Sequence, residues 1–155
     1  MVQLNMAVEP LVREAFAAAV ARDPGRSAEA LRAMADGGDA TVQDSVNLAT
    51  LVAAFALRDL NGGQRPDDAD LQRLAGSFVE MNEWAEFDPD TVRSVLTALA
   101  DQRSVEGELP AQEVARLIFV LGVWLMAAFG PDERHWWQYL DQILDALESA
   151  AETSR

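Results

Sequence analysis

One loop of the sequence carries carboxylates at spacings that a calcium site would need. In the segment 59–70, side-chain oxygens fall at positions 1, 3, 9 and 12 of twelve residues. The pattern fails where calcium chemistry is strict. Position 5 is Gly63, position 6 is Gln64 instead of the glycine of the sharp turn, and Asp70 at position 12 is too short for bidentate binding. Arg65 adds a positive charge. The sequence therefore predicts an ordinary turn between helices, and we expect no metal and no cofactor.

Residue types that perform catalysis are otherwise sparse. The chain has no cysteine and no lysine, and His135 is its only histidine. A di-iron bundle needs two Glu-x-x-His motifs and further carboxylates, which a single histidine cannot supply. Neither the Gly-x-Ser-x-Gly motif of a nucleophilic serine nor the Gly-x-Gly-x-x-Gly motif of a dinucleotide site occurs. The sequence favours a protein that is not an enzyme.

A run of acidic residues interleaved with aromatic residues suits a binding surface. Trp84 and Phe87 lie among five carboxylates between residues 80 and 90. A tryptophan among carboxylates can receive a basic partner through cation–π and ionic contacts. Phe87 has a local alternative, because a hydrophobic residue before a helix N-cap often staples the first turn. For Trp84, burial beneath the connection between two helices is an equally good interpretation. We predict a partner-binding patch formed by Glu80, Glu83, Trp84, Glu86, Asp88 and Asp90.

A second stretch is rich in aromatic residues. Six of the eleven aromatic residues lie between 119 and 139. The adjacent Trp136 and Trp137 point about 100° apart on a helix, so burying both requires a wide contact face. We predict that one of them crosses a two-fold homodimer interface while the other lies in the core. The predicted dimer or ligand surface consists of His135, Trp136, Trp137 and Tyr139, with packing in the core as the alternative.

Composition narrows the choice of partners. The chain has 26 acidic and 12 basic residues, a formal net charge of −14. Nucleic acids and anionic membranes are disfavoured, because both recruit clusters of Lys and Arg. A basic protein is favoured, although an acidic surface also simply keeps a protein soluble. The start of the chain has no secretory pattern, and its longest uncharged stretch, of 15 residues, is shorter than the roughly 20 that span a membrane. We expect a cytoplasmic protein.

Helical periodicity runs through nearly the whole chain, and no alternating pattern of a β-strand competes with it. Ser27, Asp88 before Pro89, and Asp132 are the predicted N-caps of the second, fifth and seventh helices. Met81 and Ala35 are expected on buried helix faces. The sequence predicts one all-α domain over residues 1–155, an orthogonal or bundle-like array of six to seven helices. Its most apolar helices, 41–60 and 110–129, are expected at the centre.

These observations favour a non-catalytic protein–protein interaction or regulatory module, such as an immunity or antitoxin-type inhibitor of a basic partner. The alternative is a helical bundle that binds a small molecule or uses carboxylates for catalysis. That alternative requires polar side chains that meet in a cavity. An acidic mimic of DNA would need carboxylates spaced along one face, whereas here they are spread over several helices. The polar candidates on the two central helices are Gln43, Asp44, Asn47, Gln112 and Arg116.

Overall fold

The computed structural model describes residues 6–101, 111–129 and 135–153, and within these ranges the chain is all-α. No strand occurs in the described part, which confirms the predicted fold class. In the described residues, single 3₁₀ turns, η1 (Met6–Val8) and η2 (Glu83–Ala85), accompany seven α-helices. The α-helices are α1 (Glu9–Val20), α2 (Pro24–Asp36), α3 (Asp39–Leu60), α4 (Asp68–Met81), α5 (Pro89–Ala100), α6 (Ala111–Phe129) and α7 (Trp136–Thr153).

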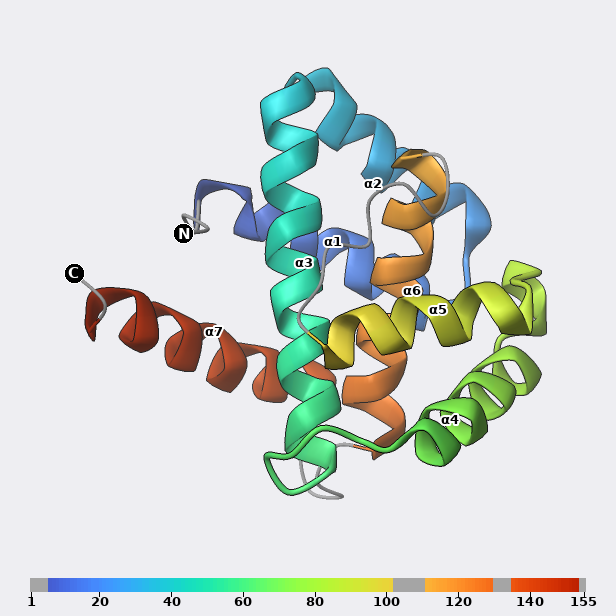
Figure 1. Ribbon diagram of the computed structural model, residues 1–155. Coiled ribbons are helices and arrows are strands. Elements are labelled where there is room, and N and C mark those ends of the chain that lie inside the picture. The colour runs from blue at the N-terminus through green and yellow to red at the C-terminus, as the bar shows by residue number, and fades with distance from the viewer. Residues whose placement is uncertain (1–5, 102–110, 130–134, 154–155) are drawn as a thin grey trace.

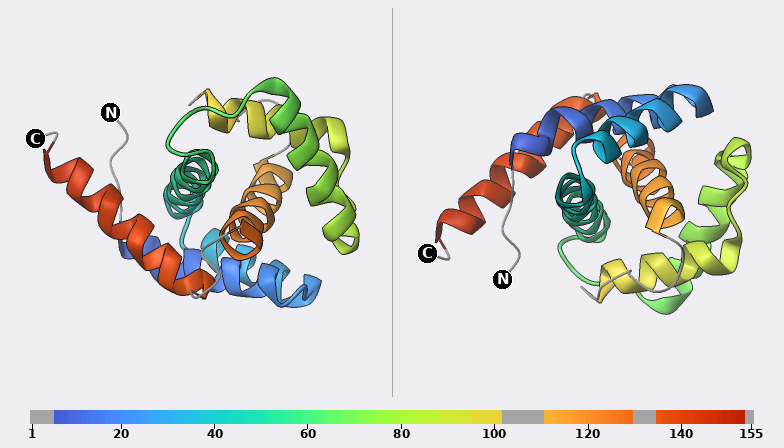
Figure 2. Two further views of the ribbon diagram at one scale, coloured as in Figure 1. Left: turned by 90° about the horizontal axis from the view of Figure 1, so that it is seen from below. Right: turned by 90° about the horizontal axis from the view of Figure 1, so that it is seen from above.

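The helices α3 and α6 form the centre, as their apolar sequences predict. They lie side by side, with α1 and α7 on one side of the pair and α4 and α5 on the other (Figure 2). Every residue from Leu117 to Met126 of α6 is buried, which matches a helix that is apolar on all faces. Gly122 permits close packing, because a Cβ atom there would lie 3.0 Å from the ring of Phe16 and 3.6 Å from Ala53 Cβ.

One flank of α3 is less enclosed than the sequence suggests. Leu48, Val52 and Leu57 are buried, whereas Leu51 and Phe55 are only half-buried. Within the described ranges α3 is also the one helix long and apolar enough to cross a membrane. The central helix of a helical array passes that test equally well, and α3 holds that central place here (Figure 1).

The start of α2 differs from the prediction. Asp23 is the N-cap, because its Oδ1 accepts a hydrogen bond from the Arg26 backbone N–H at 3.1 Å, and Pro24 is the first helical residue. Ser27 lies inside the helix, with a buried Oγ that has no hydrogen-bond partner. Asp23 and Pro24 together thus form the start signal of α2. The same pair at Asp88 caps α5 as predicted, accepting from the Thr91 N–H at 3.2 Å.

The first half of α7 is fastened to α1 and α3, while its second half extends away from the body (Figure 1). Tyr139 is only 4% exposed, and its hydroxyl donates a hydrogen bond to the carboxylate of Asp59 on α3. The Arg13 side chain of α1 donates to Asp141. Tyr139 therefore belongs to the core and not to the predicted dimer or ligand surface. Burial, and then the bond to Asp59, raise the pKa of the Tyr139 hydroxyl above its ordinary value.

The capping assignment predicts opposite outcomes for two neighbouring alanine substitutions. Asp23→Ala removes the acceptor for the Arg26 N–H and is expected to lower the free energy of unfolding by about 1 kcal/mol. Ser27→Ala removes a buried hydroxyl that lacks a partner, so the free energy of unfolding is expected to stay the same or rise. Denaturant unfolding of both variants measures this order. A larger loss of stability in Ser27→Ala than in Asp23→Ala would mean that Ser27 is the N-cap.

The contact between Tyr139 and Asp59 predicts an alkaline loss of stability. Since the hydroxyl pKa is raised in the folded protein, stability is complete below the ordinary tyrosine pKa and falls as pH rises above about 10. Tyr139→Phe is expected to lose about 1 kcal/mol at neutral pH and to lack this part of the alkaline decline. Tyr139 is the only tyrosine, so tyrosinate absorbance follows it alone. A native protein that titrates at the ordinary value would contradict the prediction.

Candidate functional site

The predicted patch lies on the connection between α4 and α5, which we call the acidic turn (residues 80–90). Asn82 is the C-cap of α4. Its side chain is 6% exposed, and its Nδ2 donates to the Phe78 carbonyl at 2.9 Å. The turn η2 follows, and Glu86 takes a left-handed conformation with φ 55° that redirects the chain into α5. The acidic turn is therefore a compact corner of defined backbone shape, and not an extended loop.

An arginine from α6 supports the acidic turn from the inside. Arg116 Nη1 donates to the Ala85 carbonyl at 2.8 Å, and its guanidinium lies 4.4 Å from the centre of the Phe87 ring. Phe87 in turn stacks on Phe78 of α4, with ring centroids 5.8 Å apart. Phe87 thus packs inward against α4, and the predicted staple on the first turn of α5 stays a prediction. Nothing in the spacing of the sequence indicated that Arg116 would meet the acidic turn, 31 residues away.

Besides Phe87, the acidic turn carries two large apolar side chains, Trp84 and Met81. Trp84 is half-buried and packs against the core, and its Nε1 is buried without a hydrogen-bond partner. Trp84 therefore combines both interpretations of the sequence, packing and partial exposure. Met81 was predicted to be buried but is 47% exposed. It is the last residue of α4, where its side chain reaches the edge of the core, and its sulfur accepts the Nε1–H of Trp124 at 3.5 Å.

The carboxylates of the acidic turn are exposed and lack arginine partners. Glu80, Glu83, Glu86 and Asp90 make no ion pair with any of the described residues, and Asp88 is the N-cap of α5. Arginines instead neutralise acids elsewhere: Arg13 pairs with Glu9 and Asp141, Arg26 with Glu14, Arg65 with Asp68 and Asp101, Arg73 with Asp70, and Arg116 with Glu113. The acidic turn is thus a cluster of uncompensated negative charge.

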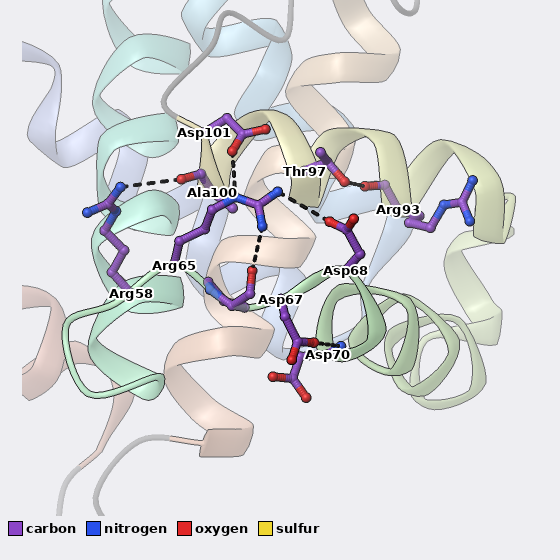
Figure 3. A network of polar contacts seen from close by, with 10 residues as sticks. Arg58, Arg65, Asp67, Asp68, Asp70, Arg93, Thr97, Ala100 and Asp101 are labelled. Carbon is purple, nitrogen blue, oxygen red and sulfur yellow. Dashed lines mark hydrogen bonds and ion pairs between the residues drawn. The ribbon is translucent and has the colours of Figure 1, made fainter.

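The loop that resembled a calcium site is held together by hydrogen bonds and ion pairs between its own residues and to the end of α5 (Figure 3). Arg65 lies at its centre and donates to Asp101 at 2.5 Å, to the Pro66 carbonyl at 2.9 Å and to Asp68 at 3.4 Å. Asp67 caps α4 by accepting from the Asp70 N–H at 2.8 Å. Asp67, Asp68 and Asp70 therefore start a helix or pair with arginines, while Asp59 accepts from Tyr139. Across the described residues, no group of three or more metal-binding side chains is arranged to hold an ion.

The aromatic cluster of α7 is divided between surface and core. His135 and Trp137 stack face to face with ring centroids 4.2 Å apart, and Trp136 meets Trp137 edge-on at 6.0 Å. Trp137 is 45% exposed, whereas Trp136 packs against the core. The structure thus brings three of the four predicted residues together, while Tyr139 faces inward. The homodimer stays a prediction, and Asp132 lies outside the described residues.

The polar candidates for a small-molecule site do not converge. Gln43 is exposed and donates to Asn47 at 3.0 Å on the same helix. Arg116 and Ser27 line a crevice between α1, α2 and α6. The crevice has a volume of about 10 Å³, which suits one water molecule. The side chain of Gln112 lies outside the described residues. These candidates form no shared pocket in the part of the chain that the structure describes.

Because Arg116 supports the acidic turn, replacing Arg116 is expected to lower the stability of the protein and to loosen the turn. Arg116→Met keeps much of the side-chain length but removes the hydrogen bond to the buried Ala85 residue and the cation–π contact. The free energy of unfolding is expected to fall by about 1–3 kcal/mol, and amides 83–88 should exchange faster with solvent.

The matched control is Arg73→Met, because the Arg73 side chain is 76% exposed in its ion pair. It is expected to change the free energy of unfolding by less than about 0.5 kcal/mol. Unaltered exchange of amides 83–88 in Arg116→Met would contradict the supporting role.

Comparison with known proteins adds no family to this description. No protein family, curated protein or solved structure matches the chain.

Proposed function

We propose that the protein is a non-catalytic interaction module that binds a basic protein through the acidic turn. The observation that carries the proposal is the cluster of exposed, unpaired carboxylates around Met81 and Trp84 on a turn that Arg116 holds in shape. The proposed contact residues are Glu80, Glu83, Trp84, Glu86, Asp88 and Asp90, together with Met81.

Electrostatics supports this assignment. Like charges that cluster on one corner repel each other in the free protein, and a cationic partner relieves that repulsion. Charge of one sign also steers an oppositely charged partner toward the site and raises the association rate. The exposed Met81 and the half-buried Trp84 would supply the apolar centre that a specific interface needs inside its charged rim.

An acidic helical protein of this kind suits the role of an immunity or antitoxin-type inhibitor. Such an inhibitor covers a basic surface of its target, and the net charge of −14 favours that pairing. The same charge disfavours nucleic acid and anionic membranes as partners. The alternative, a bundle that binds a small molecule or uses carboxylates for catalysis, is less well supported, since its polar candidates do not meet in one pocket of the described chain.

The proposal predicts a site-specific effect of charge on partner binding. The basic partner is recovered by co-purification at low salt and then titrated in purified form. A triple variant of the acidic turn, Glu80→Gln with Glu83→Gln and Glu86→Gln, is expected to weaken binding at least about tenfold and to reduce its dependence on salt. Trp84→Ala should weaken binding with little change in that dependence.

The control removes the same number of charges elsewhere. Asp36→Asn with Asp145→Asn and Glu148→Gln also neutralises three exposed carboxylates, at the last residue of α2 and on α7, away from the acidic turn (Figure 1). Binding by this control is expected to stay within about twofold of the original protein, because distant exposed charges are screened. Equal weakening by both triple variants, or by neither, would rule out the acidic turn as the contact surface.

A further inference from the structure

The contact between Met81 and Trp124 places a reactive thioether at the surface beside a buried hydrogen-bond donor. Met81 is 47% exposed, whereas Met34 and Met126 are 1% and 2% exposed. The Nε1–H of Trp124 points at the Met81 sulfur from 3.5 Å. Trp124 is itself 6% exposed and packs edge-on against Phe78, with centroids 5.3 Å apart. The donor is therefore held in place by the core.

We propose that Met81 is a site of reversible oxidation by hydrogen peroxide, and that Trp124 binds the product. A lone pair of the sulfur attacks one peroxide oxygen, the O–O bond breaks, and the other oxygen leaves as water after proton transfer. The sulfur loses two electrons and the peroxide gains them, which gives methionine sulfoxide. The sulfoxide oxygen then accepts the Trp124 Nε1–H in place of the sulfur.

The surroundings of Met81 favour this product over oxidation of Met34 and Met126. A thioether sulfur is a weak acceptor, whereas a sulfoxide is polar and accepts strongly. At Met81 the new oxygen meets solvent and an indole N–H that is already in place. At Met34 or Met126 it would be buried among apolar side chains, which costs free energy unless a partner is present. Peroxide also reaches those two sulfurs only after local opening.

Oxidation would exchange an apolar side chain on the acidic turn for a polar one, and methionine sulfoxide reductases could reverse it. This inference stands on the Met81–Trp124 contact alone. It holds whether or not the acidic turn binds a basic protein.

Peptide mapping after exposure to dilute peroxide tests the site. Met81 is expected to gain one oxygen at least about tenfold faster than Met34 and Met126, and treatment with methionine sulfoxide reductases should restore it. The helical circular dichroism should persist through the reaction. Equal rates at Met81 and the two buried methionines would overturn the proposal.

The indole N–H resonances test the role of Trp124. In protein labelled with ¹⁵N-tryptophan, the four tryptophans give four indole signals, which Phe substitutions of Trp84, Trp136 and Trp137 assign by elimination. Oxidation is expected to shift the Trp124 signal most, and Met81→Leu should abolish that shift under the same peroxide treatment. A Trp124 signal that stays in place at full conversion of Met81, or a larger shift of Trp84, would overturn the assignment.

Discussion

The structure depends on the need to enclose α6 on every side. Its buried run from Leu117 to Met126 exposes no polar face to water, so other helices must cover it all round. The helices α1 and α3 both pack against α6 at Gly122, where an added Cβ atom would press on the ring of Phe16. The pair of α4 and α5 completes the cover through Phe78, which meets Trp124. Because α4 packs on α6 through Phe78, the acidic turn at the end of α4 lies beside α6.

The helical elements could be predicted from the sequence because amphipathic periodicity is a local property. The same holds for the Asp88–Pro89 start of α5, which the structure reproduces. Ser27 shows where local reasoning stops. Asp23-Pro24 can end one helix or begin the next, and only the path of the chain decides between them. Ser27, predicted from the sequence as the cap, lies inside the first turns of α2.

The candidate site was predictable in its charges and not in its contacts. A run of carboxylates is visible in the sequence, but their lack of counter-ions depends on where distant arginines fold. The position of Met81 shows the same limit. Periodicity places it on the inner face of α4, yet α4 ends there, at the edge of the core. Tyr139 was misplaced in the opposite direction, because its partner Asp59 is 80 residues away.

The Arg65–Asp101 pair has a consequence for how the molecule can vary. It joins the residues just before α4 to the residue just after α5, so the two ends of this helical hairpin meet. Arg58 near the end of α3 also donates to the Ala100 carbonyl, so both ends of the hairpin lie beside the end of α3. A segment whose ends meet can be lengthened, shortened or exchanged with little strain on the rest. The tip of the hairpin, the acidic turn, can therefore vary in length and sequence, provided that the residues with which α4 and α5 cover α6, such as Phe78, are kept.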